Sequence, residues 1–232
     1  MIRFLPLLLI IGYGLVLWHF SARALKRQLD TKSRRLNDTA LTPLLDRLAA
    51  ALDVPRVEVH VYEIEPINGL AAPDGRVFIT EGFMKKYRAG EVTAEEITSV
   101  IAHELGHVAR GHARRRMIDF SGQNALRVVL ASLIGRFVPF IGIWIANLVT
   151  TALAARLSQR DEFEADEFAS ALLIKAGIGV GPQISLFRKL DALSTRQAGA
   201  APGAGVPAWL LTHPKTPRRI AAIEANAARW VA

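Results

Sequence analysis

Residues 93–109 read TAEEITSVIAHELGHVA, and this stretch carries both a helix signature and a reactive pattern. Thr93 and Glu96 form the capping-box pattern T-x-x-E, which predicts a helix beginning directly after Thr93. Apolar residues then recur at helical spacing and predict one buried face, made of Ile97, Val100, Ile101, Leu105 and Val108. We therefore expect the reactive residues to lie within a helix rather than in a loop.

Within that helix, His103, Glu104 and His107 make the pattern H-E-x-x-H. Two histidines four residues apart leave one helix face a turn apart, so both imidazoles could bind one Zn²⁺ at ~2.0–2.1 Å. Glu104 would then lie beside the metal and act as a general base. The alternative is a helix whose histidines are ordinary surface or core residues.

A third metal ligand must come from elsewhere, because a catalytic zinc usually has three protein ligands and the chain has no cysteine. Glu162 and Asp166 are four residues apart, so on a helix they share a face. We expect Glu162 to coordinate the metal and Asp166 to accept the second ring N–H of a ligand histidine. Glu164 would point about 160° away from them and be solvated or paired with an arginine. The alternative is a charged helix face with ion pairs.

Patterns around the reactive helix predict a small sheet. Valines alternate with polar residues over 57–61, and residues 76–80 follow a Pro-Asp-Gly turn, so both segments are expected to be strands. Further helices are expected over about 42–53 with Thr42 as N-cap, over about 155–176 ending at Gly177, and from Pro217 onward after a flexible loop at 194–208. The expected fold class is α+β, mainly helical, with the sheet packed near the H-E-x-x-H helix.

The N-terminus is free of charge from Phe4 to Trp18, which predicts a membrane helix of about 17 residues, the short end for a span. Six lysines and arginines follow within residues 23–35, and positive charge there opposes translocation of the chain that comes after. We expect an uncleaved single anchor, with the bulk of the chain in the cytoplasm. The alternative is a cleaved signal with its site near residues 21–24, which would place the domain outside the cytoplasm.

These features divide the chain into an anchor at 1–22, a basic juxtamembrane segment at 23–40 and a metal-binding domain at 41–232. A second apolar stretch, 126–153, lies between the predicted ligands, so an odd number of membrane crossings is excluded. It is too short for two crossings of about 20 residues each. We expect two short helices broken near 135–142, which cover the domain or dip into the near leaflet.

Composition excludes several classes of protein. The 232 residues are 51% hydrophobic, which excludes a disordered chain. The net charge of +8 is compatible with anionic lipid head groups, whereas nucleic-acid binding is not expected because aromatic residues do not interleave with the basic ones. The absence of cysteine excludes disulfides and thiolate ligands.

Four segments in order carry a resemblance to a known family. NGLAAPDGRVFITEG at 68–82, HELGH at 103–107, RDEFEADEFA at 160–169 and LLTHPKTPRRI at 210–220 resemble the zinc metallopeptidase family that includes the HtpX membrane protease and the CAAX prenyl protease. The resemblance covers about residues 41–220 and implies a zincin-like, gluzincin domain. It implies one Zn²⁺ per chain, with His103, His107 and Glu162 as ligands and Glu104 as catalytic base.

The last of these segments matches the family's late H-P-x-x-x-x-R-I motif through His213 and Arg219. The resemblance makes both residues candidates for donating to the negative charge that develops on the substrate oxygen. The alternative for His213 is a helix-capping or buried structural role.

The implied activity is that of a membrane-anchored zinc endopeptidase acting on unfolded or membrane-associated polypeptides. An extended substrate would pair as an added strand along Asn68, Gly69, Leu70 and Ala71, where Gly69 replaces the alanine more usual in the family. Two alternatives are a site-specific processing peptidase and a non-catalytic, metal-stabilised chaperone or binding module at the membrane. The second of these has no use for a general base beside the ligands.

Overall fold

The computed structural model describes residues 26–72, 74–112, 141–197 and 217–231, together with seven isolated positions outside these ranges. The chain divides into two compact units. The larger unit combines Leu29–Arg110 with Glu162–Ala232, and the smaller unit combines Met1–Gln28 with Gly111–Asp161. Each unit is described by itself.

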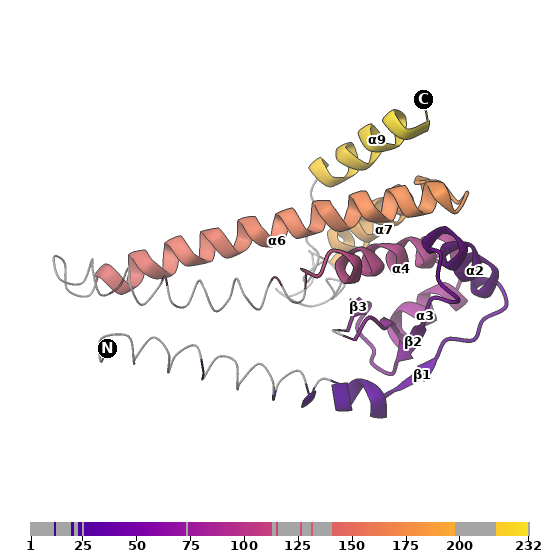
Figure 1. Ribbon diagram of the computed structural model, residues 1–232, viewed down its shortest axis with the longest axis horizontal. Helices are drawn as coiled ribbons and strands as arrows, with labels where there is room; N and C mark the ends of the chain where they lie inside the picture. Colours follow the sequence, from indigo (N-terminus) through magenta and orange to yellow (C-terminus); the bar gives the residue numbers. More distant parts are fainter. Residues whose placement is uncertain are drawn as a thin grey trace. The chain divides into compact units, whose positions relative to one another are not determined.

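The larger unit contains a four-stranded sheet in the order β1-β2-β4-β3 (Figure 1). The parallel pair β2 (Val59–Tyr62) and β4 (Val77–Thr80) forms its centre. The short strands β1 (Ser33–Arg35) and β3 (Gly69–Ala71) flank this pair and run antiparallel to it. β4 is buried over all four residues because it has a neighbour on each side and a helix against its face.

The strands differ from the prediction, which included the segments of β2 and β4 but neither β1 nor β3. β2 begins at Val59 rather than Val57, whose half-buried side chain packs against the core just before the ladder begins. β1 lies within the segment that we expected to be only a basic stretch. Its sequence, Ser-Arg-Arg, has no apolar alternation and so gave no strand signal. The strand forms at the edge of the sheet through backbone pairing with β2.

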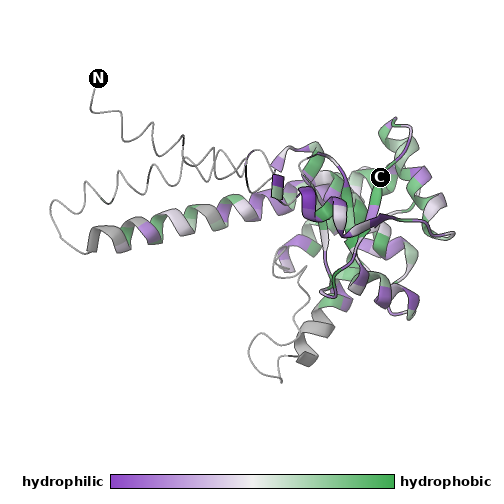
Figure 2. Ribbon diagram, turned by 90° about the horizontal axis from the view of Figure 1, so that it is seen from below, coloured by the Kyte–Doolittle hydropathy of each residue, from purple (hydrophilic) through white to green (hydrophobic). Residues whose placement is uncertain are grey.

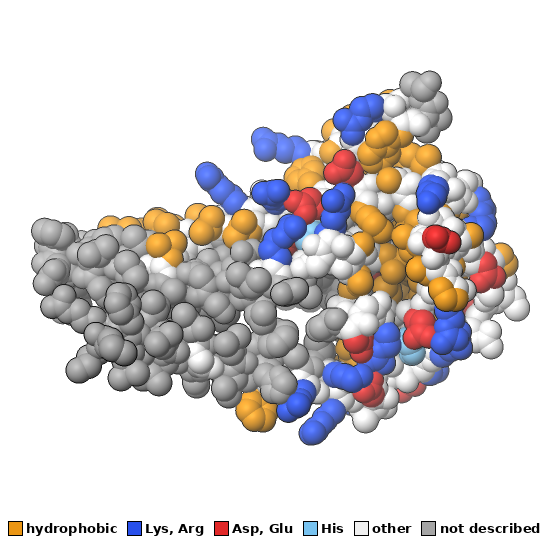
Figure 3. Space-filling view, viewed as in Figure 1, with side chains coloured by type: hydrophobic (Ala, Val, Ile, Leu, Met, Phe, Trp, Pro, Cys, Tyr) orange, Lys and Arg blue, Asp and Glu red, His pale blue; other side chains and the backbone are white. Residues whose placement is uncertain are grey.

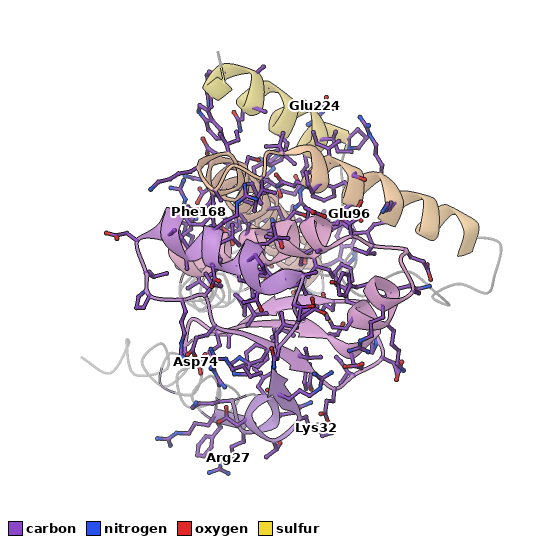
Figure 4. All side chains as sticks on the ribbon, turned by 90° about the vertical axis from the view of Figure 1, so that its right-hand side faces the viewer. Arg27, Lys32, Asp74, Glu96, Phe168 and Glu224 are labelled. Atoms are coloured by element: carbon purple, nitrogen blue, oxygen red, sulfur yellow. The ribbon has the colours of Figure 1, made fainter. Side chains whose placement is uncertain are left out.

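Helices pack on the sheet and on one another: α2 (Leu41–Leu52), α3 (Glu81–Arg88), α4 (Ala94–Ala109), α7 (Gly181–Gln197) and α9 (Pro217–Val231). α4 is central, because it contacts β3 and β4 as well as α2 and α7. The predicted capping box is confirmed, since the Thr93 side chain accepts from the Glu96 N–H while Glu96 accepts from the Thr93 N–H. Figure 4 shows side chains from the sheet and these helices filling the space between them.

The start of α2 is a correction to the sequence analysis. The helix begins at Leu41, with Ala40 rather than Thr42 in the N-cap position, and the N–H groups of Ala40 and Leu41 donate to Asp38 Oδ1 at 3.0 Å. At the other end Asp53 adopts a left-handed conformation with φ of 56°.

The long helix α6 (Ile141–Lys175) runs through parts of both units. We expected a helix starting near residue 155, separate from the apolar stretch before it. Residues 141–153 of that stretch and the expected helix form one helix, because residues 143–176 contain neither glycine nor proline. Gly177, with φ of 68°, ends the helix as predicted. The break expected near 135–142 falls mostly outside the described residues.

Hydrophobic and hydrophilic residues alternate along α6 (Figure 2). In the smaller unit its first turns expose Trp144 and Leu148, which are 66% and 56% exposed. The exposed Arg156 and Arg160 follow, and Figure 3 shows the change from hydrophobic to basic side chains along this helix.

The predicted N-terminal membrane helix, residues 1–22, lies outside the described residues apart from Gly12 and Phe20. No helix in the described part of the chain combines the length and the hydropathy that a membrane crossing requires. α7 extends to Gln197, so the first residues of the loop predicted over 194–208 are helical.

Candidate metal centre

Two buried histidines on α4 face one carboxylate on α6. His103 Nε2 and His107 Nε2 lie 3.1 Å apart, as expected for histidines one helical turn apart. Glu162 presents Oε2 at 3.4 Å from His103 Nε2 and Oε1 at 3.5 Å from His107 Nε2. The donor atoms of all three side chains therefore surround a single point.

These separations match what zinc requires. Ligand atoms placed tetrahedrally at ~2.0–2.1 Å from a zinc ion lie about 3.3 Å from one another. The observed separations of 3.1, 3.4 and 3.5 Å bracket that value. Two histidines and one glutamate are also a known donor set of catalytic zinc sites, in which the fourth position is left open. The residues present thus fit a zinc ion.

The charges at the site also favour a divalent cation. Glu104, Glu162 and Asp166 are all buried, and within the described part of the chain Arg219 is the one lysine or arginine buried to the same degree. Three carboxylates against one guanidinium give the site an excess of acidic side chains. Buried charges are costly unless they are paired or bind a metal, so this excess favours a divalent cation.

Asp166 fixes the orientation of His103. Its Oδ1 lies 2.9 Å from His103 Nδ1, so the imidazole presents its other nitrogen, Nε2, to the metal position. Burial raises the pKa of Asp166, but hydrogen bonds from Arg219 and His103 outweigh this effect and the pKa is lowered. Burial likewise opposes a charge on His103, yet hydrogen bonds with Asp166 and Glu162 raise its pKa to about 9. Metal binding would therefore release a proton from this site.

Arg219, at the start of α9, joins the two carboxylates of α6. Its Nε and Nη2 donate to Asp166 at 2.6 and 2.9 Å, and its Nη1 lies 3.3 Å from Glu162 Oε2. The residue is only 1% exposed, and its guanidinium also lies over the ring of Phe187. The sequence motif identified this arginine but not its partners.

Glu104 lies between the histidines and the edge of the sheet. A Cβ atom added to Gly69 would come within 3.3 Å of Glu104 Oε1 and 2.7 Å of Val100 Cγ1. β3 therefore crosses α4 at the level of Glu104, and Gly69 permits the close approach. The sequence predicted that this segment lies near the site, but the contact itself depends on tertiary packing.

The other predicted residues are those of the expected substrate strand, which lie in or beside β3, and His213. Asn68 is tied to β4 on both sides of its peptide, because its N–H donates to Thr80 Oγ1 at 2.9 Å and its carbonyl accepts the Thr80 N–H at 3.0 Å. Leu70 and Ala71 continue the strand beside it. His213 lies outside the described residues.

Sequence reasoning missed two residues beyond Asp166. Ser170 lies one turn further along α6, and its Oγ is 2.9 Å from Gln183 Oε1 on α7. The spacing of four from Asp166 was the one signal for Ser170, whereas nothing in the sequence pointed to Gln183.

Comparison with known proteins is consistent with this geometry. Residues 35–227 match Peptidase family M48. The chain is 32% identical to metalloprotease LoiP of Escherichia coli (strain K12) over 66% of this chain and 59% of LoiP. It is 30% identical to metalloprotease YcaL of the same organism over 59% of this chain and 52% of YcaL. It is 27% identical to a protease HtpX homolog of Bordetella avium (strain 197N) over 77% of this chain and 67% of that protein. The chain thus spans between about half and two thirds of the length of these relatives.

Proposed function

The chain belongs to peptidase family M48, and on this premise we propose that it is a zinc-dependent endopeptidase. His103, His107 and Glu162 hold the metal, and Glu104 is the general base. The observation that carries this proposal is the spacing of 3.1 to 3.5 Å between the donor atoms of two histidines on α4, the helix that carries Glu104, and of Glu162 on α6.

Bound zinc would polarise the scissile carbonyl and lower the pKa of water at the site. Glu104 accepts the proton of the attacking water and later delivers it to the leaving amine nitrogen. Its side chain is 1% exposed, so competing solvent is excluded from this proton transfer. A general base in this position favours an enzyme over a binding module that uses zinc only for stability.

The contacts of Arg219 support a positioning role rather than the oxyanion role expected from the motif. All three guanidinium nitrogens are directed at Asp166 and Glu162. The side chain therefore holds in place both the proposed ligand Glu162 and Asp166, the hydrogen-bond partner of His103. His213 stays the proposed donor to the developing oxyanion.

The edge of β3 supports binding of an extended polypeptide. Asn68 bonds to Thr80 of β4 and Ala72 bonds to Arg76 just before β4. Because bonding alternates along an antiparallel ladder, Leu70 also faces β4. The N–H and C=O groups of Gly69 and Ala71 therefore point to the outer side of the strand. Among the described residues no strand pairs with that side. A substrate strand can add there, beside Glu104.

Recognition through backbone groups is independent of side-chain identity, which favours a broad specificity. We therefore propose unfolded or membrane-associated polypeptides as substrates, in a quality-control setting. Membrane attachment is proposed through residues 1–22, with the exposed apolar turns of α6 around Trp144 and Leu148 near the lipid. A site-specific processing peptidase would need pockets for particular side chains along this edge.

The full chain, purified in detergent, can test the activity with an unfolded casein-like substrate. We expect cleavage that a chelator abolishes and zinc restores. Glu104→Gln should retain stoichiometric zinc but lose activity by about 10²–10⁴-fold or more, because only the base is removed. Glu162→Gln should lose most of the zinc, and Glu164→Gln should keep it. Cleavage at the parent rate by zinc-loaded Glu104→Gln would disprove the mechanism.

Topology can be tested separately, because the chain has no native cysteine. Single cysteines at Ser121, Gly142 and Ser158 should never report opposite faces of the membrane if residues 126–153 do not cross it. Labelling of the Gly142 position from the far side alone, with both others labelled from the near side, would show a spanning hairpin instead.

A further inference from the structure

Gln183, near the start of α7, is a buried amide behind the metal site. Its side chain is 3% exposed, and its Oε1 lies 2.9 Å from Ser170 Oγ. Among the described residues, none offers a hydrogen-bond partner to its Nε2. A buried polar atom without a partner is costly, so the surroundings of this amide have to provide one.

The proton on Ser170 decides which way the amide points. Ser170 Oγ lies 2.7 Å from the backbone carbonyl of Asp166, to which it donates as a helix back-bond. A hydroxyl has one proton, so it cannot also donate fully to Gln183 Oε1. Exchanging the oxygen and nitrogen of the amide leaves its outline unchanged. Nε2 then donates to Ser170 Oγ, and Oε1 takes the position that needs a partner.

Gln183 borders a small cavity that His103 and Asp166 also line. The cavity is lined by Ser99, Val100, His103, Asp166, Gln183, Leu186 and Phe187. Its volume of about 10 Å³ is that of one water-sized sphere. Ser99 Oγ donates to the Glu96 carbonyl at 2.7 Å, so its lone pairs can accept a hydrogen bond. A single water can donate to both Ser99 Oγ and Gln183 Oε1, which gives it the two polar partners that it needs.

We propose that Gln183 is a positioning residue for the metal centre. It acts through Ser170 on the turn of α6 that carries Asp166, and through one buried water on the wall formed by His103 and Asp166. Together these contacts keep the His103 imidazole and the Asp166 carboxylate in their hydrogen-bonded orientation. The inference rests on the zinc site proposed above. It means that a residue of α7 supports the metal-site side chains without contacting the metal itself.

Gln183→Met tests the role of the amide, because methionine has a similar length but no hydrogen bonds. The full chain in detergent is titrated with zinc against a competing chelator, and the visible spectrum of the Co²⁺-loaded protein reports ligand geometry. We expect zinc affinity to fall about 3–10-fold, less than the 10–100-fold typical of direct partners of a ligand. The Co²⁺ bands should shift. Leu186 lines the same cavity, and Leu186→Met changes packing alone. This variant should leave the zinc affinity and the Co²⁺ spectrum unchanged.

Ser170→Ala and the double variant separate a relay from two independent effects. If Gln183 acts through Ser170, the double variant should lose little more affinity than Gln183→Met alone. If the double variant loses zinc affinity by the product of the two single-variant factors, the two residues act independently and the relay is contradicted. Gln183→Asn keeps an amide and should retain more affinity than Gln183→Met, whereas equal losses would show a packing role only and overturn the proposal.

The two proposals fail in different ways. If the parent chain does not bind zinc, or if His103→Ala binds it equally well, the metal centre itself is wrong. If the parent binds zinc and Gln183→Met binds it as tightly with an unchanged Co²⁺ spectrum, only the role of Gln183 is wrong. Should Gln183→Met fail to fold, Ser170→Ala and Gln183→Asn supply the same comparison.

Discussion

Gly106 of α4 packs against the backbone of Ala165 in α6 so closely that a Cβ on Gly106 would lie 2.9 Å from the Ala165 carbonyl oxygen. Gly106 lies between the two histidines of the H-E-x-x-H motif, and Ala165 lies between Glu162 and Asp166. The two helices therefore come into backbone contact at the level of the proposed metal ligands. This contact brings the helices close enough for the side chains of His103 and His107 on α4 and Glu162 on α6 to meet.

Gly106→Ala should separate the helices, because the atoms that the new methyl group meets belong to the backbone and cannot rotate away. We expect zinc affinity to fall at least about tenfold as the ligands move apart. The free energy of unfolding should fall by about 1–3 kcal/mol, although alanine is the better helix former. Zinc titration and urea unfolding of the full chain measure the two effects.

Gly181→Ala is the matched control, since a Cβ at Gly181 meets no described heavy atom within 4 Å. It should leave zinc affinity unchanged. Equal zinc binding by Gly106→Ala and the parent chain would show that the close approach is not required.

The same contact shows how far the sequence could predict the site. The capping box and the apolar spacing predicted α4 and the face that carries the histidines, because both signals are local. The spacing of four also predicted that Glu162 and Asp166 share a face. The need for glycine at position 106 could not be predicted, because it depends on which backbone crosses α4 at that level.

Non-local features were missed for the same reason. β1 has no strand pattern and exists through pairing with β2, about 25 residues later in the chain. Gln183 carries no motif and gains its significance from Ser170 and the cavity behind His103. For Arg219, the motif gives a residue type but not the carboxylates that it contacts.

Arg219→Lys distinguishes the two roles considered for this residue. A lysine keeps the positive charge but cannot bridge two carboxylates as the planar guanidinium does. We expect zinc affinity to fall about 10–100-fold, because a lysine can pair with only one of Asp166 and Glu162 and the other loses its partner. Arg218→Lys changes an exposed neighbour and should have no effect. Unchanged zinc affinity combined with a reduced kcat would instead support donation to the substrate oxygen.

Ala71→Pro tests the edge of β3 as the substrate-binding strand. Proline removes the Ala71 N–H, which points away from β4, and proline is tolerated on edge strands. The sheet should therefore remain intact while one hydrogen bond to substrate is lost. At about 1 kcal/mol for such a bond, kcat/KM should fall roughly fivefold to tenfold.

Ala72→Pro provides the contrast, because the Ala72 N–H donates to the Arg76 carbonyl at 2.8 Å within the sheet. This variant should lower the free energy of unfolding, whereas Ala71→Pro should not. If Ala71→Pro cleaves peptides as efficiently as the parent, the substrate does not pair at this edge.

Glu96, labelled in Figure 4, joins the N-terminal end of α4 to α7 and should make stability depend on pH. Its carboxylate accepts from Lys189 Nζ at 2.8 Å and from Ser185 Oγ at 2.7 Å. Burial raises the pKa of Glu96, but these bonds and the Thr93 N–H outweigh it, so the pKa is below its ordinary value of 4.5. A lowered pKa means that Glu96 stabilises the fold above about pH 4.5 and loses this contribution as the pH falls through the folded-state pKa.

The comparison of Glu96→Gln with the parent chain in urea, from pH 7 to pH 3, measures this contribution. Both proteins are kept in chelator so that loss of zinc at low pH does not contribute. We expect a difference of about 1–2 kcal/mol at neutral pH, reduced because Lys189 is partly solvated, and a smaller difference below pH 4.5. Glu95→Gln, at an exposed position of the same helical turn, should show little change. A difference between Glu96→Gln and the parent that stays constant across this range would show that the charge of Glu96 does not stabilise the contact between α4 and α7.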